Sequence, residues 1–122
     1  MSKTGEQSYN LEERTAKLGE NIIVLCRKMK RDSITAPLIS QVVRSGTSVG
    51  ANYMEANQAS SRKDFRNKIY IAKKEANETM HWLRMITKAC PDHGDECRSL
   101  WQEAKELTLI FSKITSTLNS KK

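Results

Sequence analysis

The sequence has little of what favours a β-sheet or a membrane-spanning protein. Only 6% of its residues are aromatic, and it holds five glycines and two prolines. Strands are enriched in aromatic and β-branched residues, so this composition favours long helices. No apolar run approaches the ~20 residues needed to cross a bilayer. The polar N-terminal stretch MSKTGEQSYNLEER contains no apolar signal core. We therefore expect an all-α, cytoplasmic protein that makes no contact with a membrane.

The charged residues and the cysteines narrow the class of protein further. Lys and Arg number 21 against 14 Asp and Glu, which is a formal net charge of +7. This excess permits an anionic partner such as RNA or DNA, although charge also serves solubility. Cys26, Cys90 and Cys97 are an odd number in a chain large enough to fold without disulfides. They favour free thiols in a reducing compartment.

Apolar residues recur at alternating steps of four and three in four segments, at about residues 10–30, 35–59, 61–90 and 95–118. In the first segment they are Leu11, Thr15, Leu18, Ile22, Leu25 and Met29. This spacing places one core-facing stripe along each helix. Asn10 is the expected N-cap of the first helix, and Ser61 with Asp64 approximates a capping box for the third. We predict a single domain over residues 1–122, folded as an up-down-up-down four-helix bundle.

The second segment contains a stretch with the composition of a loop. Residues 45–52, SGTSVGAN, hold two glycines and three hydroxyl side chains. The spacing nevertheless continues through them, at Leu38, Val42, Ser45, Val49, Asn52 and Ala56. We predict one continuous helix and, because it is nearly free of charge, expect it to be the most enclosed of the four.

Two further points concern the glycines of this segment. Gly46 and Gly50 share a helix face, where small residues let a neighbouring backbone approach closely. Packing must then offset about 1 kcal/mol for each glycine. A nucleotide-binding loop is not indicated, because the Gly-x4-Gly-Lys-Ser/Thr spacing and a preceding strand are missing.

A set of polar and apolar residues in the middle of the chain resembles a known family. The order is Gln41, Arg44, Ser48-Val49, Asn52 and Glu55, then Ser61-Arg62-Lys63-Asp64-Phe65, Tyr70-Ile71-Ala72 and Glu75-Ala76-Asn77-Glu78. It resembles the four-helix-bundle family of proteins encoded in intervening sequences of bacterial 23S rRNA genes, which also includes the accessory variability protein of diversity-generating retroelements. The resemblance covers about residues 10–118.

The resemblance implies a homopentameric barrel with a basic, nucleic-acid-compatible surface. For the retroelement member it also implies association with reverse transcriptase and RNA. One motif departs from the family. The common Asn-Ile-Ala-Glu-Gly run is Asn52-Tyr53-Met54-Glu55-Ala56 here, so the second helix is free to run further toward Ser60.

Several polar residues fall on or beside the predicted core stripes. A buried carboxylate needs charged or hydrogen-bonding partners, and polar residues on a stripe can fix helix register. We predict a structural network formed by Arg44, Ser45, Asn52, Glu55, Glu75 and Glu78. No catalytic residue is predicted, because a paired nucleophile and acid or base is missing.

Two patterns invite a metal site, and neither is complete. Glu78-x-x-His81 is a single copy of a pair that bundle di-iron sites use twice. Cys90, His93 and Cys97 lie close in the sequence but lack an evident fourth ligand for zinc. We therefore predict neither a metal nor another cofactor.

Some large apolar residues lie off the predicted stripes. Part of this reflects a wide core face, and the rest indicates a second buried surface and hence self-association. The candidates for an oligomer interface are Ile71, Trp82, Met85, Trp101 and Ile110.

The basic residues cluster in two places, near the end of the first helix and in the first half of the third. The candidates for nucleic-acid binding are Arg27, Lys28, Lys30, Arg31, Arg62, Lys63, Arg66, Lys73 and Lys74. We find no aromatic platform among them, so salt-sensitive phosphate contact should dominate. The prediction is a non-enzymatic, self-assembling bundle that presents a basic surface to RNA, DNA or a nucleic-acid enzyme such as a reverse transcriptase. The alternative is a structural or protein-interaction module whose charge serves solubility. The sequence does not indicate a specific partner or pathway.

Overall fold

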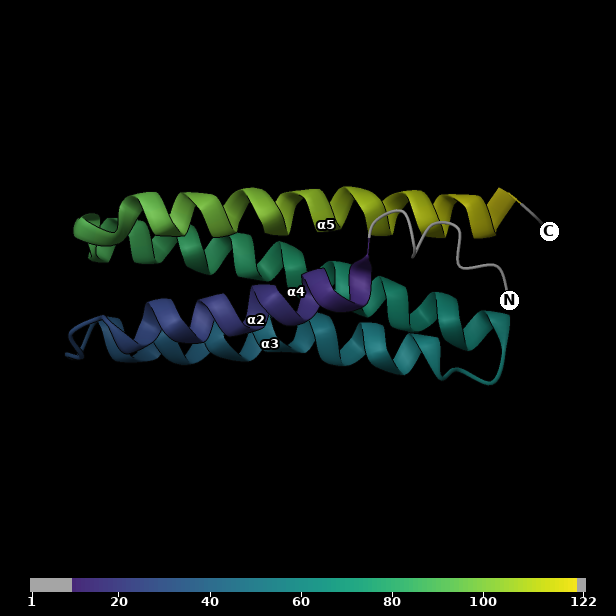
Figure 1. The fold of residues 1–122 in the computed structure, drawn as a ribbon, viewed down its shortest axis with the longest axis horizontal. Coiled ribbons are helices and arrows are strands. Elements are labelled where there is room, and N and C mark those ends of the chain that lie inside the picture. Colours follow the sequence, from purple (N-terminus) through teal and green to yellow (C-terminus); the bar gives the residue numbers. More distant parts are fainter. Residues whose placement is uncertain (1–9, 121–122) are drawn as a thin grey trace.

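Four long helices make up nearly all of the computed structural model, which describes residues 10–120. They are α2 (Leu11–Arg27), α3 (Thr35–Asn57), α4 (Arg62–Ala89) and α5 (Gly94–Ser120), and a short 3-10 helix η1 (Pro91–His93) precedes α5. Successive helices run in opposite directions and lie side by side (Figure 1). The prediction of an all-α, up-down-up-down four-helix bundle is confirmed.

The helices differ in length, and this shapes the bundle. α2 has 17 residues, against 28 in α4 and 27 in α5. At about 1.5 Å per residue, α2 covers only some 25 Å of a bundle about 40 Å long. α3, α4 and α5 therefore continue past the start of α2 at one end (Figure 1). Within residues 10–120 no helix combines the length and the apolar composition needed to span a membrane.

Side chains in the preceding turns cap the N-terminal ends of two helices. Ser61 accepts a hydrogen bond from the amide of Asp64 at 3.0 Å, as expected for the third segment. At the start of α3, Asp32 accepts from the amides of Thr35 and Ile34 at 2.8 and 2.9 Å. These amides, Thr35 first, hold the pKa of Asp32 below its usual value. Asn10 occupies the N-cap position of the first helix, as expected, but its side chain makes no capping hydrogen bond.

α3 is continuous through both glycines, as predicted, and α2 packs closely against it there. A methyl group on Gly50 would lie 3.4 Å from the backbone of Thr15, and one on Gly46 would lie 2.3 Å from Cδ1 of Ile22. A methyl group on Gly19 of α2 would likewise lie 3.4 Å from Cα of Thr47 in α3. The glycines thus allow the two helices to approach closely.

α3 also shows where the predicted stripe is off by one residue. Tyr53 is buried and Asn52 is only half-buried, and near its start Ile39 is buried more deeply than Leu38. α3 packs against both α2 and α4, so its core face is wide enough to include two neighbouring positions of the heptad. At each pair the larger or more apolar side chain occupies the interior.

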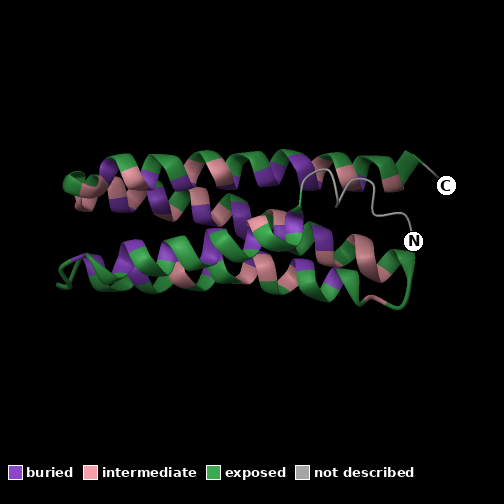
Figure 2. Ribbon diagram, in the orientation of Figure 1, coloured by how far each residue is buried: buried purple, intermediate pink, exposed green. Residues whose placement is uncertain are grey.

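The expectation that α3 is the most enclosed helix is wrong, because seven of the 17 residues of α2 are buried, against eight of the 23 in α3. Its outer face exposes Ser40, Thr47, Ala51 and Met54, as the pattern of buried and exposed residues along the helices shows (Figure 2). These residues are uncharged, which is why the sequence suggested burial. Small polar and apolar residues tolerate exposure without a large free-energy cost.

Candidate nucleic-acid interface

Besides Lys68, which pairs with Glu55, the first half of α4 carries five basic side chains within 13 positions. They are Arg62, Lys63, Arg66, Lys73 and Lys74. Two of them form hydrogen bonds with the C-terminal end of α5. Nη2 of Arg62 donates to the carbonyl of Leu118 at 2.8 Å, and Nη1 of Arg66 donates to Oδ1 of Asn119 at 3.5 Å. Terminal helix carbonyls lack partners within their own helix, so an arginine from a neighbouring helix suits this place.

The carboxylates of α4 lie on a different side of the helix. At about 100° per residue, Asp64, Glu75 and Glu78 project away from the direction of Arg62, Arg66 and Lys73. Glu75 and Glu78 instead pair with Arg44 of α3. The basic side chains therefore form a strip, which we call the α4 stripe: Arg62, Lys63, Arg66, Lys73 and Lys74. Its neighbour Glu78, four positions after Lys74, is already paired with Arg44.

An aromatic side chain lies within the α4 stripe. Tyr70 is 43% exposed, and its hydroxyl accepts from Nδ2 of Asn119 at 3.1 Å. Its neighbours on the helix surface, three and four positions away, are Arg66, Asn67, Lys73 and Lys74. The sequence interpretation that no aromatic accompanies the basic residues is therefore wrong. Counting helical neighbours around Tyr70, rather than looking for separate aromatic clusters, would have found it.

The second predicted basic group does not join the stripe. Arg27, Lys28, Lys30 and Arg31 lie at the end of α2 and in the following turn, at the opposite end of the bundle from the start of α4 (Figure 1). Lys28 forms an ion pair with Glu96 of α5. The structure thus separates the predicted binding residues into two groups that a short ligand does not contact together.

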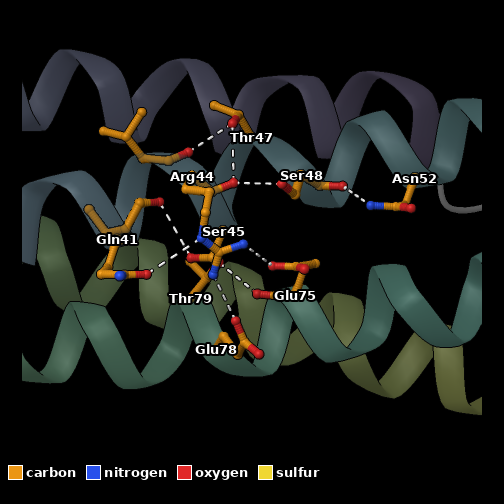
Figure 3. A network of polar contacts seen from close by, with 11 residues as sticks. Gln41, Arg44, Ser45, Thr47, Ser48, Asn52, Glu75, Glu78 and Thr79 are labelled. Carbon is orange, nitrogen blue, oxygen red and sulfur yellow. Dashed lines mark hydrogen bonds and ion pairs between the residues drawn. The ribbon is translucent and has the colours of Figure 1, made fainter.

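The predicted polar network forms in part, around Arg44 (Figure 3). Arg44 donates to Glu75 at 3.3 Å and to Glu78 at 2.9 Å. The bond to Glu78 is the main reason that the pKa of Arg44 is raised. The side chain of Glu75 is 10% exposed and that of Arg44 is 50% exposed, so the network lies at the edge of the core.

Ser45 is buried but has a different partner, and two predicted members lie elsewhere. Thr79, which was not predicted for the network, donates to Oγ of Ser45 at 2.9 Å. Asn52 donates to the carbonyl of Ser48 in its own helix at 2.9 Å, and Glu55 accepts from Lys68 at 2.7 Å. Asn52 and Glu55 are outside the network because the neighbouring Tyr53 occupies the core position and turns them toward the surface.

Four of the five predicted interface residues are at least partly exposed, and Ile110 is not. Met85 and Trp101 line an apolar groove of about 1000 Å³ between α4 and α5. Trp82 is half-buried against the core, and Ile71 is 37% exposed. Ile110 belongs to the protein's own core at 8% exposure, because α5 also has a wide core face. Ile110 is therefore not available to a second copy.

The residues considered for a metal site are not arranged as one. In the part of the chain that the structure describes, no group of three or more His, Cys, Asp and Glu side chains is placed to hold a metal ion. Nδ1 of His93 lies 3.0 Å from Oε1 of Glu96. Cys26 and Cys97 are buried, and Cys90 is partly buried. All three thiols are free.

We expect Cys90 to react with a thiol reagent in the folded protein, and Cys26 and Cys97 to react only after unfolding. Burial raises the pKa of all three thiols, that of Cys26 to about 11, but only Cys90 is partly exposed and therefore accessible to the reagent. At pH 8 only about one Cys26 in 10³ is then the reactive thiolate. Titration with a disulfide reagent before and after adding urea measures which thiols react in the folded protein and which react only after unfolding. Rapid reaction of all three thiols in the native protein would contradict the packing.

The fold and this surface define an antiparallel four-helix-bundle protein with a basic stripe on one helix. The family profile described as 23S rRNA-intervening sequence protein matches residues 7–113, and the chain belongs to that family.

A solved structure agrees with this assignment. A crystal structure of a protein of unknown function from the S23 ribosomal protein family of Bacteroides thetaiotaomicron is similar over 85% of this chain and 96% of that one. The two have 32% sequence identity and a TM-score of 0.76. No curated protein matches this sequence.

Proposed function

We propose that this protein is a non-enzymatic nucleic-acid-binding bundle whose α4 stripe contacts phosphates. The observation that carries the proposal is how few side chains of the α4 stripe are paired with a carboxylate. In residues 10–120, Lys63, Arg66, Lys73 and Lys74 form no ion pair with a carboxylate, whereas Arg14, Lys28, Arg44, Lys68 and Arg98 all do. Their charge is therefore available to an anion from outside.

The geometry of the stripe suits one strand of a nucleic acid. From Arg62 to Lys74 the helix rises about 18 Å. A strand with one phosphate per about 3.4 Å would place roughly five phosphates along this length. Five neutralised phosphates give an affinity that falls about 10²-fold between 50 and 200 mM salt.

Self-association is the second part of the proposal, and the family resemblance suggests a pentamer. Exposed apolar side chains support it: Val24 is 54% and Leu109 61% exposed, and the groove beside Trp101 is open. In a closed ring the α4 stripe would repeat around the axis, and its field would add. Light scattering should then give the mass of five 13.9 kDa chains. The mass of one chain at micromolar concentration would remove this part of the proposal.

The test of binding compares two variants with the same change in net charge. Lys63→Glu/Arg66→Glu/Lys74→Glu reverses the α4 stripe, and Arg27→Glu/Lys30→Glu/Arg31→Glu reverses the group at the other end. We expect the first to weaken oligonucleotide binding about 10²-fold and the second by less than about threefold. Fluorescence anisotropy with a 20-nucleotide probe at 50 mM salt measures both.

Three results would count against binding through the α4 stripe. They are no binding by the wild-type protein, binding that does not change with salt, and equal loss in the two triple variants. With no binding at all, the alternative stands: a protein-interaction module whose charge serves solubility. A reverse transcriptase would then be tested as a protein partner, by co-purification with the wild-type and the stripe-reversed bundle.

A further inference from the structure

Tyr70 is the one exposed aromatic side chain in the described part of the chain. Its exposed fraction is 43%, whereas Tyr53 and Phe111 are buried and Trp82 and Trp101 are half-buried. Tyr70 is not part of the hydrophobic core cluster. Core packing therefore does not explain a large aromatic ring at this position.

The surroundings of Tyr70 are basic or neutral on every side along α4. Three and four positions away lie Arg66, Asn67, Lys73 and Lys74, and seven positions away lie Lys63 and Asn77. These are the positions that share its face of the helix. None of them is acidic. The ring is thus placed in the middle of the cations rather than at the edge of the α4 stripe.

The side chain of Tyr70 is also held in place by α5. Its hydroxyl accepts from Nδ2 of Asn119, and Oδ1 of the same Asn119 accepts from Arg66. The amide of Asn119 therefore links the ring to the nearest cation of the α4 stripe. The hydroxyl is thus held at the α5 side, and the exposed part of the side chain that remains for a base is the ring. A ring fixed in advance loses less conformational entropy on binding.

We infer that the α4 stripe binds single-stranded nucleic acid, with a base stacked on Tyr70 and the neighbouring phosphates on Arg66 and the lysines. Bases of a single strand expose their faces, whereas bases of a duplex are stacked on one another. An aromatic ring between cations is how proteins hold single strands without reading their sequence. The inference rests on the proposed function and adds the strand state and the stacking residue.

The test separates the ring from the charge. Tyr70→Ala removes the ring, and Tyr70→Phe keeps it while losing the hydroxyl. The probes are a 20-nucleotide oligo(U), a 20-nucleotide oligo(dT) and a 20-base-pair duplex, with binding followed by anisotropy at 50 mM salt.

We expect Tyr70→Ala to weaken binding of the single strands about 10- to 100-fold and of the duplex by less than about threefold. Tyr70→Phe should bind single strands within about threefold of wild type, because stacking needs only the ring. The slope of affinity against salt should be unchanged in Tyr70→Ala, since no charge is lost, but lower in the triple charge variant. Circular dichroism confirms that each variant is folded.

The outcomes distinguish the two proposals. If Tyr70→Ala binds single strands as tightly as wild type while the charge variant does not, the stacking inference is wrong and the phosphate-binding function stands. Equal weakening of single strands and duplex would likewise overturn the inference. If the wild-type protein binds none of the probes, the proposed function fails, and the stacking inference fails with it.

Discussion

Replacing Tyr53 with alanine should lower the free energy of unfolding by about 3–5 kcal/mol, the range seen when large core aromatics are truncated. Tyr53 is only 2% exposed. Its ring centroid lies 6.2 Å from that of Phe111 in α5, with the rings tilted by 34°. Truncation would remove this aromatic contact between α3 and α5 and leave a cavity that the surrounding helices cannot fill. Urea unfolding followed by circular dichroism at fixed protein concentration measures the change.

The matched control for Tyr53 is its neighbour. Asn52→Ala should change stability by less than about 0.5 kcal/mol, because the substitution affects a half-buried site near the surface. The Asn52 side chain bonds only to the carbonyl of Ser48 in the same helix. The two substitutions test which of two adjacent positions faces the core. A larger loss for Asn52→Ala than for Tyr53→Ala would mean that α3 is rotated relative to the structure described above.

Replacing Gly46 with leucine should destabilise the protein by about 3 kcal/mol, at the upper end of overpacking costs. Even a single methyl group on Gly46 would lie 2.3 Å from Cδ1 of Ile22. Ile22 is fully buried, so its side chain has little room to withdraw. A leucine would therefore push α2 away from α3 and expose apolar surface on both helices. Thermal and urea unfolding at fixed protein concentration measure the loss.

The control for Gly46 is the second glycine on the same face. Gly50→Ala should be neutral or stabilise the protein by up to about 1 kcal/mol, because alanine is the better helix former. Its new methyl group would meet the backbone of Thr15 at 3.4 Å, which is ordinary contact. Unchanged stability in Gly46→Leu would show that α2 does not pack on α3 through these glycines.

The close approach of α2 and α3 also explains how a helix tolerates this composition. Two internal glycines cost α3 about 2 kcal/mol of helix propensity. In return, Gly46 leaves room for the buried side chain of Ile22, and Gly50 faces the backbone of Thr15. Ser45, beside the first glycine, is satisfied by Thr79 of α4. Each residue that resembled a loop in the sequence has a packing or hydrogen-bonding role within a straight helix.

The contacts between α2 and α5 differ in character from those between α2 and α3. α2 has much less contact with α5 than with α3, and ion pairs of one arginine join the two helices. Arg14 donates to both carboxylate oxygens of Glu103, at 2.9 and 2.7 Å, and to Glu106 at 2.8 Å. The hydrogen bonds to Glu103 are the main reason that the pKa of Arg14 is raised. These pairs are partly exposed, so we expect them to orient α2 more than to stabilise it.

By itself the sequence determined the fold class, the number of helices and the core face of each helix to within one residue. All six stripe positions of the first segment, from Leu11 to Met29, are buried. It also determined that the glycines lie on a close-packed face. These properties depend on spacing along one helix, where 3.6 residues per turn relates position to direction.

Only the tertiary structure decided which residues meet across helices. It placed Tyr53 rather than Asn52 in the core, paired Arg44 with Glu75 and Glu78, and set Asn119 of α5 against Tyr70. Such contacts depend on how each helix is rotated and shifted against its neighbours. The rotation and shift of a helix depend on the turns and on the sizes of the side chains at the interfaces. The spacing of apolar residues within a single helix does not reveal them.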